Sequence, residues 1–380
     1  MLFIKLRNIL CACLALTVLT FPGPVLAEYG LNLTQGVTPI SREVYDLHMT
    51  ILWVVTVIAI LVFAVMFWSI FHHRKSKGAV AAQFHHSTGA EIAWTIIPIL
   101  ILVAMAVPAT QVLIKMEETE DTEMTIKITG YQWKWHYDYM NEGFDFFSAL
   151  DETSNTIRQL KSGLNPDEHE NYLLEVDNPV VVPVNTRIRL LTTAADVIHA
   201  WWVPDLGWKR DAIPGFINDN WTYIEEPGTY RGQCAELCGR DHGFMPIVLK
   251  AVSKEEYADW ADEMKLAAAA AADESGKTFT MEESMAKGED VYKTQRAACH
   301  QANGEGLPGA FPALKGGAIA TGDLPGHLDI VINGKAGTAM AAFGGQLNDA
   351  ELAAVITYER NAWGNDTGDL VQPADIKAAR

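Results

Sequence analysis

Two cysteines, two histidines and a methionine are the residues of this 380-residue chain that could most readily bind a metal. Cys234, Cys238, His242 and Met245 lie in one stretch, Cys-Ala-Glu-Leu-Cys-Gly-Arg-Asp-His-Gly-Phe-Met, and His199 lies upstream. Thiolate, thioether and imidazole groups together suit copper. One thiolate would suit a single copper ion, whereas two can bridge two coppers that share one unpaired electron. The pattern therefore favours an electron-transfer site with two coppers.

Two other kinds of site could use some of these residues. In an exported protein, Cys234 and Cys238 could form a disulfide. A tetrahedral zinc site could use the same two cysteines with His199 and His242. Neither alternative accounts for Met245, so we favour copper.

The N-terminus and the apolar runs indicate export and a membrane anchor. Residues 1–27 have the features of a cleaved signal peptide: Lys5 and Arg7 at the start, an apolar core, and Val25-Leu26-Ala27 before the cleavage site. An uncleaved anchor is the alternative. Two later runs, at about 49–71 and 92–114, are long enough to cross a bilayer core of ~30 Å.

Basic residues between the two runs predict the topology. Arg74, Lys75 and Lys77 lie in the connecting loop, which places it in the cytoplasm. Residues 28–115 are therefore predicted to form a transmembrane hairpin, and everything after Lys115 is predicted to lie outside the cell membrane. The formal charge of −18 disfavours nucleic acid and favours a basic protein partner, although it could simply aid solubility.

Residues 116–254 have the pattern of a cupredoxin-like β-sandwich. Apolar residues alternate over Met124–Ile128, and aromatic residues alternate from Tyr131 to Tyr139, as on one face of a strand. Residues 141–171 are polar and are predicted to form a long loop. Further strands are predicted at 172–176, 180–184, 187–192, 198–203, 228–230 and 246–252.

The residues from 28 to 254 resemble subunit II of cytochrome c oxidase, a heme-copper oxidase. The resemblance rests on Cys-x-Glu-x-Cys-x-x-x-His-x-x-Met, on Asp196-Val-Ile-His199 and on Asp211-Ala-Ile-Pro-Gly215. It implies that Cys234 and Cys238 bridge two coppers, the CuA centre, while His199 and His242 each bind one. It also implies that Met245 completes one copper and the Glu236 backbone carbonyl the other. The Glu236 side chain would reach a Mg²⁺ at the contact with subunit I.

Two residues outside the ligand cluster acquire roles from the same resemblance. Trp133, in Gly-x-Gln-Trp-x-Trp, matches the aromatic residue through which electrons enter from cytochrome c. Without that context it would be an ordinary aromatic residue of a sandwich. Glu91 matches the carboxylate at the entrance of a lysine-type proton channel. Its alternative interpretation is a carboxylate favoured by the N-terminal end of a helix dipole.

The C-terminal part resembles a small all-α class I cytochrome c domain, predicted at 282–366 after a linker at 255–281 and before a tail at 367–380. The resemblance implies that His300 and Met340 are axial heme ligands, a pairing that gives a high reduction potential. Covalent attachment of heme c expects Cys-x-x-Cys-His, but Arg296 stands where the first cysteine belongs, before Cys299. Heme could attach through Cys299 alone, or bind weakly or not at all; a sequence error or recent mutation is the third interpretation.

These features predict a subunit of a proton-pumping cytochrome c oxidase. It would accept electrons from cytochrome c at CuA and pass them to the heme-copper centre of subunit I, where O₂ is reduced to water. We expect a multi-pass protein of a bacterial inner membrane, with periplasmic soluble domains and with subunits I and III as partners. A copper-delivery protein, nitrous oxide reductase and a quinol oxidase subunit II are the alternatives. The first needs no two-helix anchor, the second needs a multi-histidine domain, and the third lacks copper ligands.

Overall fold

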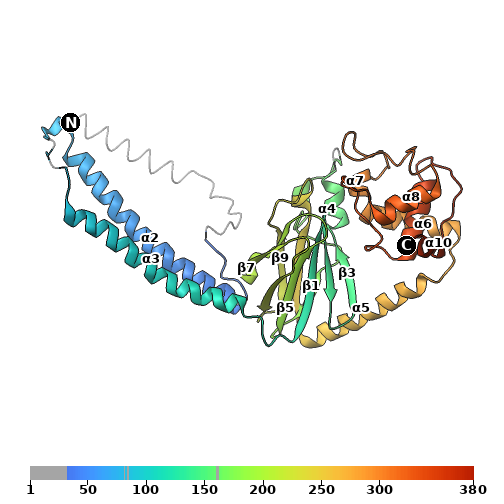
Figure 1. Cartoon of the computed structure of the whole chain (residues 1–380), viewed down its shortest axis with the longest axis horizontal. Coiled ribbons are helices and arrows are strands. Elements are labelled where there is room, and N and C mark those ends of the chain that lie inside the picture. Colours follow the sequence, from blue (N-terminus) through green and yellow to red (C-terminus); the bar gives the residue numbers. More distant parts are fainter. Residues whose placement is uncertain (1–31, 81, 84, 160–161) are drawn as a thin grey trace, which may run out of the picture. The chain divides into compact units, whose positions relative to one another are not determined.

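The computed structural model describes residues 32–80, 82–83, 85–159 and 162–380. The predicted signal peptide therefore lies outside the described residues. Along the chain, two long helices are followed by a β-sandwich, a connecting helix and a group of C-terminal helices (Figure 1).

The two long helices are α2 (Pro39–His72) and α3 (Thr88–Glu117), and both are long and apolar enough to cross a membrane. Helix α2 begins well before the apolar run because Thr38 and Ser41 form a capping box and Pro39 occupies the first turn. Large apolar side chains such as Phe63 and Leu100 are exposed along both helices. Such helices are stable where lipid or another apolar protein surface replaces water.

The β-sandwich consists of two five-stranded sheets. One sheet has the order β3-β2-β1-β5-β8, and the other has the order β4-β10-β9-β6-β7. Neighbouring strands are antiparallel except for β1 with β5 and β10 with β4, which are parallel. The strands are β1 (Met124–Tyr131), β2 (Lys134–Tyr139), β3 (Phe144–Ser148), β4 (Val180–Pro183), β5 (Arg187–Ala194), β6 (His199–Val203), β7 (Trp208–Ala212), β8 (Asn218–Tyr223), β9 (Gly228–Cys234) and β10 (Pro246–Val252).

The sandwich core follows from the alternation seen in the sequence. Trp135, Tyr137 and Tyr139 occupy every second position of β2, and all three are buried. Ile126 and Ile128 of β1 join them in one continuous apolar cluster. Because side chains of a strand point alternately to its two faces, this pattern gives β1 and β2 one face each toward the core.

Some local predictions for this domain were wrong. The aromatic run from Tyr131 to Tyr139 is not one strand, because the chain turns at Gln132 and Trp133 between β1 and β2. The segment 172–176 is mostly turn, with only a single bridge between Val176 and Leu150. The predicted loop at 141–171 contains β3 and a short helix, α4 (Glu152–Ile157), whose first turn is capped by Asp151.

A long helix, α5 (Lys254–Glu274), follows the sandwich and continues through the alanine run. Ser253 and Glu256 form its capping box, which explains why the helix starts directly after β10. Tyr257 and Ala261, one turn apart on the same face, belong to the sandwich core.

The C-terminal domain has its own apolar core and consists of short helices. These are α6 (Met281–Gln295), α7 (Ala297–His300), α8 (Leu324–Asn333), α9 (Asp349–Asn361) and α10 (Pro373–Ala379). Helices α6 and α9 approach closely at Gly288, where a side-chain carbon would clash with the backbone of Ala354. Val371 and Ile376 are buried in the same core, so the segment 367–380, predicted as a tail, is part of the domain.

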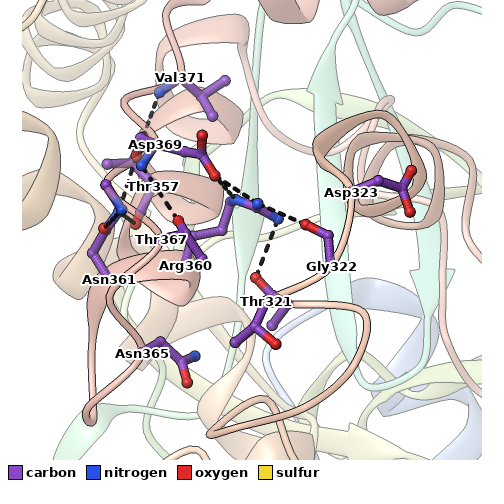
Figure 2. A network of polar contacts seen from close by, with 12 residues as sticks. Thr321, Gly322, Asp323, Thr357, Arg360, Asn361, Asn365, Thr367, Asp369 and Val371 are labelled. Atoms are coloured by element: carbon purple, nitrogen blue, oxygen red, sulfur yellow. Dashed lines mark hydrogen bonds and ion pairs between the residues drawn. The ribbon is translucent and has the colours of Figure 1, made fainter.

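Arg360 on α9 holds this C-terminal segment in place (Figure 2). Its guanidinium contacts the Asp369 carboxylate at 2.6 Å and donates to the carbonyl oxygens of Ala320 at 3.2 Å and Gly322 at 2.8 Å. The backbone N–H of Val371 donates to the Thr357 hydroxyl at 3.0 Å. The planar guanidinium thus connects α9 both to the distant segment at Ala320 and Gly322 and to Asp369 beyond the end of the helix.

Replacing Arg360 by lysine should destabilise the C-terminal domain, because a single ammonium cannot reproduce these divergent contacts. We expect a loss of about 1.5–3 kcal/mol, the range for hydrogen bonds to charged groups. Hydrogen exchange at residues 367–371 of the full chain measures the effect. Lys377→Ala, which removes an exposed cation from α10, is the control and should leave that exchange unchanged. Equal exchange in Arg360→Lys and wild type would contradict this role.

Candidate metal centre

Strand pairing brings the distant histidine to the cysteine-containing loop. His199 is the first residue of β6 and Cys234 is the last of β9, and these strands pair antiparallel with Trp201 opposite Cys234. Cys238, His242 and Met245 then lie on the connection from β9 to β10. The sheet thus collects all five predicted ligands at one end of the sandwich.

The distances show that the side chains converge. Cys238 Sγ lies 3.9 Å from Cys234 Sγ, 3.5 Å from Met245 Sδ and 3.5 Å from His242 Nδ1. His199 Nδ1 lies 3.9 Å from Cys234 Sγ. The ligand atoms of His199, Cys234 and Cys238 all lie within 4.8 Å of one another.

The two cysteines are free thiols, and their separation is suited to metal sharing. A disulfide requires sulfurs about 2.05 Å apart, so the 3.9 Å separation is not that of a disulfide. Sulfurs at this distance can both bind one ion at about 2.3 Å, a usual metal–thiolate length. The backbone carbonyl of Glu236 lies 3.4 Å from Cys234 Sγ, whereas the Glu236 side chain is exposed.

The cysteines also favour deprotonation of one sulfur. A hydrogen bond from Cys238 lowers the pKa of Cys234 to about 3, although burial opposes the shift, and His199 adds to the lowering. The same pairing raises the pKa of Cys238. A thiolate is the form that binds a metal, so the pair is partly prepared for an ion.

The orientation of His199 is fixed by a neighbouring carboxylate. Its Nε2 lies 2.9 Å from Asp196 Oδ1, which leaves Nδ1 directed toward Cys234. Asp196 also accepts a hydrogen bond from the backbone N–H of Gln132 at 2.7 Å. A carboxylate behind a histidine is a common arrangement at metal sites, because it sets the tautomer of the ligand. Sequence reasoning missed this contact, although Asp196 was part of the motif.

Trp133 is placed beside the cluster, whereas Glu91 is not. The Trp133 indole N–H donates to the backbone carbonyl of Cys238 at 3.1 Å, and the Gln132 amide donates to the same oxygen at 2.9 Å. Glu91 lies in the first turn of α3, and its carboxylate accepts the backbone N–H of Ser87 at 3.3 Å. That contact is the one expected for a carboxylate at the start of a helix.

A second set of predicted ligands, from the C-terminal domain, lines one cavity. His300 and Met340 both line it, with apolar neighbours that include Leu314 and Val331. The Nδ1 of His300 is 2.9 Å from the carbonyl oxygen of Pro312, so its Nε2 remains for a ligand. Burial, together with the charge of Arg296, lowers the pKa of His300, and the neutral form is the one that binds a metal.

These residues fit a heme in one respect and not in another. His300 and Met340 would supply the axial donors, and Cys299, which lines the same cavity, would supply one thiol. Arg296, at the position of the expected first cysteine, is buried and cannot form a thioether. The residues therefore fit heme with at most one covalent anchor.

The fold and the donor set define a membrane-anchored, cupredoxin-like electron-transfer subunit followed by a cytochrome-like helical domain. The family model for the periplasmic domain of cytochrome c oxidase subunit II matches residues 124–252, and that for its transmembrane domain matches 27–112. The model for subunit III of cbb3-type cytochrome c oxidase matches residues 283–358.

Individual proteins are also similar to the chain. The chain is 42% identical over 226 residues to a probable cytochrome c oxidase subunit 2 from Rickettsia felis, covering 59% of this chain and 68% of that protein. It is 38% identical to cytochrome c oxidase subunit 2 of Arabidopsis thaliana, covering 63% of this chain and 91% of that one. The solved periplasmic domain of subunit II from Bradyrhizobium japonicum is 41% identical, with a TM-score of 0.34 and coverage of 39% and 96%.

The chain belongs to the cytochrome c oxidase subunit II family and carries a cytochrome c domain fused after the periplasmic domain. It is thus a membrane-anchored subunit of an oxidoreductase complex, which confirms the predicted family and fold class.

A glycine beside His199 offers a test of the site. A side-chain carbon at Gly130 would lie 2.7 Å from the His199 ring, whereas one at Gly243 would meet nothing within 4 Å. Gly130→Ala should therefore displace His199, cost about 1–3 kcal/mol of stability through overpacking and weaken copper binding. Gly243→Ala, in the same loop as His242, is the control. Thermal unfolding and copper titration of the full chain measure both effects, and wild-type behaviour of Gly130→Ala would contradict the packing.

Proposed function

We propose that this chain receives electrons from cytochrome c at a two-copper CuA centre and passes them to the heme-copper centre of subunit I, where O₂ is reduced. The observation that carries the proposal is the convergence of two cysteine sulfurs, 3.9 Å apart, with two imidazoles and a thioether. A structural zinc site uses four ligands from cysteine and histidine. The buried sulfur of Met245 beside Cys238 favours copper.

Each ligand has a distinct role in this proposal. Cys234 and Cys238 would hold both coppers, His199 and His242 would each hold one, and Met245 and the Glu236 carbonyl would supply the remaining donors. Copper supplies one-electron redox chemistry. The protein contributes a rigid, water-poor pocket: Met245 and Trp135 are buried, and the Trp135 indole donates to the Met245 carbonyl at 3.3 Å. This packing would restrict movement of the ligand side chains when the bound coppers gain or lose an electron.

Trp133 is the residue we assign to electron entry. It is partly exposed, and its indole N–H is bonded to the backbone of Cys238, a bridging ligand. This provides a short path from the surface of the sandwich to the centre through one hydrogen bond and a few covalent bonds.

The membrane hairpin and two carboxylates relate this chain to the rest of the oxidase. We place α2 and α3 in a bacterial inner membrane beside subunit I, with subunit III also in the complex and with Arg74, Lys75 and Lys77 on the cytoplasmic side. Glu91 would then stand at the cytoplasmic entrance of a proton channel that serves proton pumping. The exposed Glu236 side chain is available to a Mg²⁺ at the contact with subunit I.

The C-terminal domain adds a heme site that would receive electrons before the coppers do. We assign His300 and Met340 as its axial ligands, because both line the same cavity and His300 is oriented by Pro312. Electrons from a soluble cytochrome c would pass through this domain to the coppers.

Electron paramagnetic resonance of the full chain, purified in detergent and loaded with copper, tests the copper assignment. We expect a mixed-valence signal from one electron shared by two coppers. Cys238→Ser should convert it to the signal of a mononuclear site, because only one thiolate remains. Ala235→Ser, in the same loop, is the control and should keep the wild-type signal. A type-1 signal from the wild type, or tight zinc binding without copper, would overturn the assignment.

Trp133→Phe tests the entry route. We expect reduction of the coppers by reduced cytochrome c to slow roughly tenfold, or about 1.4 kcal/mol in barrier, while the copper spectrum is unchanged. Stopped-flow kinetics measures the rate. Trp202→Phe, which alters an exposed indole on β6, is the control. Equal rates for both variants and wild type would exclude Trp133 from the route.

A further inference from the structure

Three charged or titratable side chains meet inside the C-terminal domain where the first heme-anchoring cysteine is missing. Arg296 Nε lies 2.8 Å from Glu359 Oε1, and His327 Nε2 lies 3.0 Å from Glu359 Oε2. The side chains of Arg296, Glu359 and His327 are 2%, 0% and 1% exposed. We call these three residues the buried trio.

We propose that the ion-paired Arg296, with Glu359 and His327, occupies the position of the first heme-anchoring cysteine. The domain then holds heme through a single thioether at Cys299. This inference rests on the heme binding proposed above and names the form of attachment. It also assigns a role to Glu359 and His327, which the sequence alone did not single out.

The contacts of Arg296 indicate that the fold accommodates this residue specifically. A buried guanidinium without a partner is strongly destabilising, and a chance arginine would have no reason to meet a fully buried carboxylate. Both nitrogens on one side of the guanidinium contact Glu359, with Nη2 at 3.3 Å from Oε2. Burial raises the pKa of Glu359, but Arg296 and His327 outweigh it and the net shift is downward, so the carboxylate stays charged. This argues against the interpretation of Arg296 as an error or a recent mutation.

The rest of the cavity is still prepared for a ligand. His300 keeps its hydrogen bond to Pro312, and Met340 lines the same cavity as His327 and Cys299. The Nδ1 of His327 is buried and has no hydrogen-bond partner among the residues that the structure describes. A buried nitrogen of this kind is normally satisfied by water or a ligand, so a bound molecule would complete this part of the cavity.

The attachment chemistry needs only one thiol and a heme with two vinyl groups. The Cys299 thiol adds across one vinyl group: a sulfur–carbon bond forms, and the thiol hydrogen goes to the terminal carbon of that vinyl group. No electron is gained or lost in this addition. The second vinyl group keeps its double bond, because position 296 offers no thiol.

Glu359 also positions Arg296 relative to the sulfur ligand. Arg296 Nη1 lies 3.7 Å from Met340 Sδ, and its guanidinium lies over the Phe343 ring at 4.9 Å. Arg296 thus reaches the sulfur that we assign to the heme iron while Glu359 holds the other side of its guanidinium, so Glu359 sets how closely Arg296 approaches that sulfur. Glu359 is therefore a positioning residue, acting on Met340 through Arg296.

Glu359→Gln tests the positioning role in the full chain. We expect a weaker sulfur-to-iron charge-transfer band and a lower heme reduction potential than in wild type. Asp366→Asn, which removes an exposed carboxylate just beyond α9, is the control. The double variant Arg296→Gln with Glu359→Gln removes both charges and should recover much of the band, because coupled residues are not additive. An unchanged band and potential in Glu359→Gln would overturn the positioning role.

The form of attachment is tested by expressing the full chain with a heme-maturation system and analysing the denatured protein. We expect one covalent heme on the peptide that contains Cys299, and a pyridine hemochrome band between those of two-vinyl and two-thioether hemes. Arg296→Cys should move the band to the two-thioether position, and Cys299→Ser should abolish covalent heme.

Two results would overturn the inference. Wild-type protein without covalent heme, together with covalent heme in Arg296→Cys, would mean that the buried trio replaces heme attachment altogether. Absence of heme from both proteins would also remove the heme site from the proposed function. The copper signal is measured independently in the same samples. Failure of the single-thioether attachment, or of the heme site itself, is therefore distinguishable from failure of the copper centre.

Discussion

The antiparallel pairing of β6 with β9 is the constraint on which the candidate metal centre depends. It sets Trp201 opposite Cys234 and so fixes His199, two residues away, within reach of a loop that follows much later in the chain. The loop supplies the other ligands through local spacing alone. The contribution of the sandwich is to hold one histidine and one cysteine in register before any ion is present.

Hydrogen bonds from a neighbouring turn also hold the candidate ligands in position. The turn between β1 and β2 places Gln132 and Trp133 on the carbonyl of Cys238, and Asp196 connects the same turn to His199. One short turn thereby contacts both halves of the ligand set. A change in this turn would therefore alter both the backbone at Cys238 and the orientation of His199.

Local patterns predicted which side chains of the loop lie together, whereas long-range contacts could not be predicted in the same way. The loop ligands are close in sequence, and the alternating residues of β2 are buried as expected. By contrast, the clash at Gly130 depends on how β1 meets His199 in space. Glu359 is the clearest case, since a charged residue on a helix is usually solvated, and its distant partners Arg296 and His327 explain its burial. The sequence prediction placed the segment 367–380 outside the domain as a tail, yet Val371 and Ile376 are core residues.

The continuous helix α5 limits how the length of the connection between the two soluble domains can vary. Its first turns are fixed to the sandwich by Tyr257 and Ala261, and it then continues as a single helix through the alanine run to Glu274. An α-helix advances about 1.5 Å and turns about 100° with each residue. Insertion or deletion of one alanine would therefore change the length of the helix and also rotate the chain that follows about the helix axis. A change of three or four residues would nearly restore the original rotation while altering the length by about one helical turn, whereas a change of two would rotate the following chain by roughly half a turn.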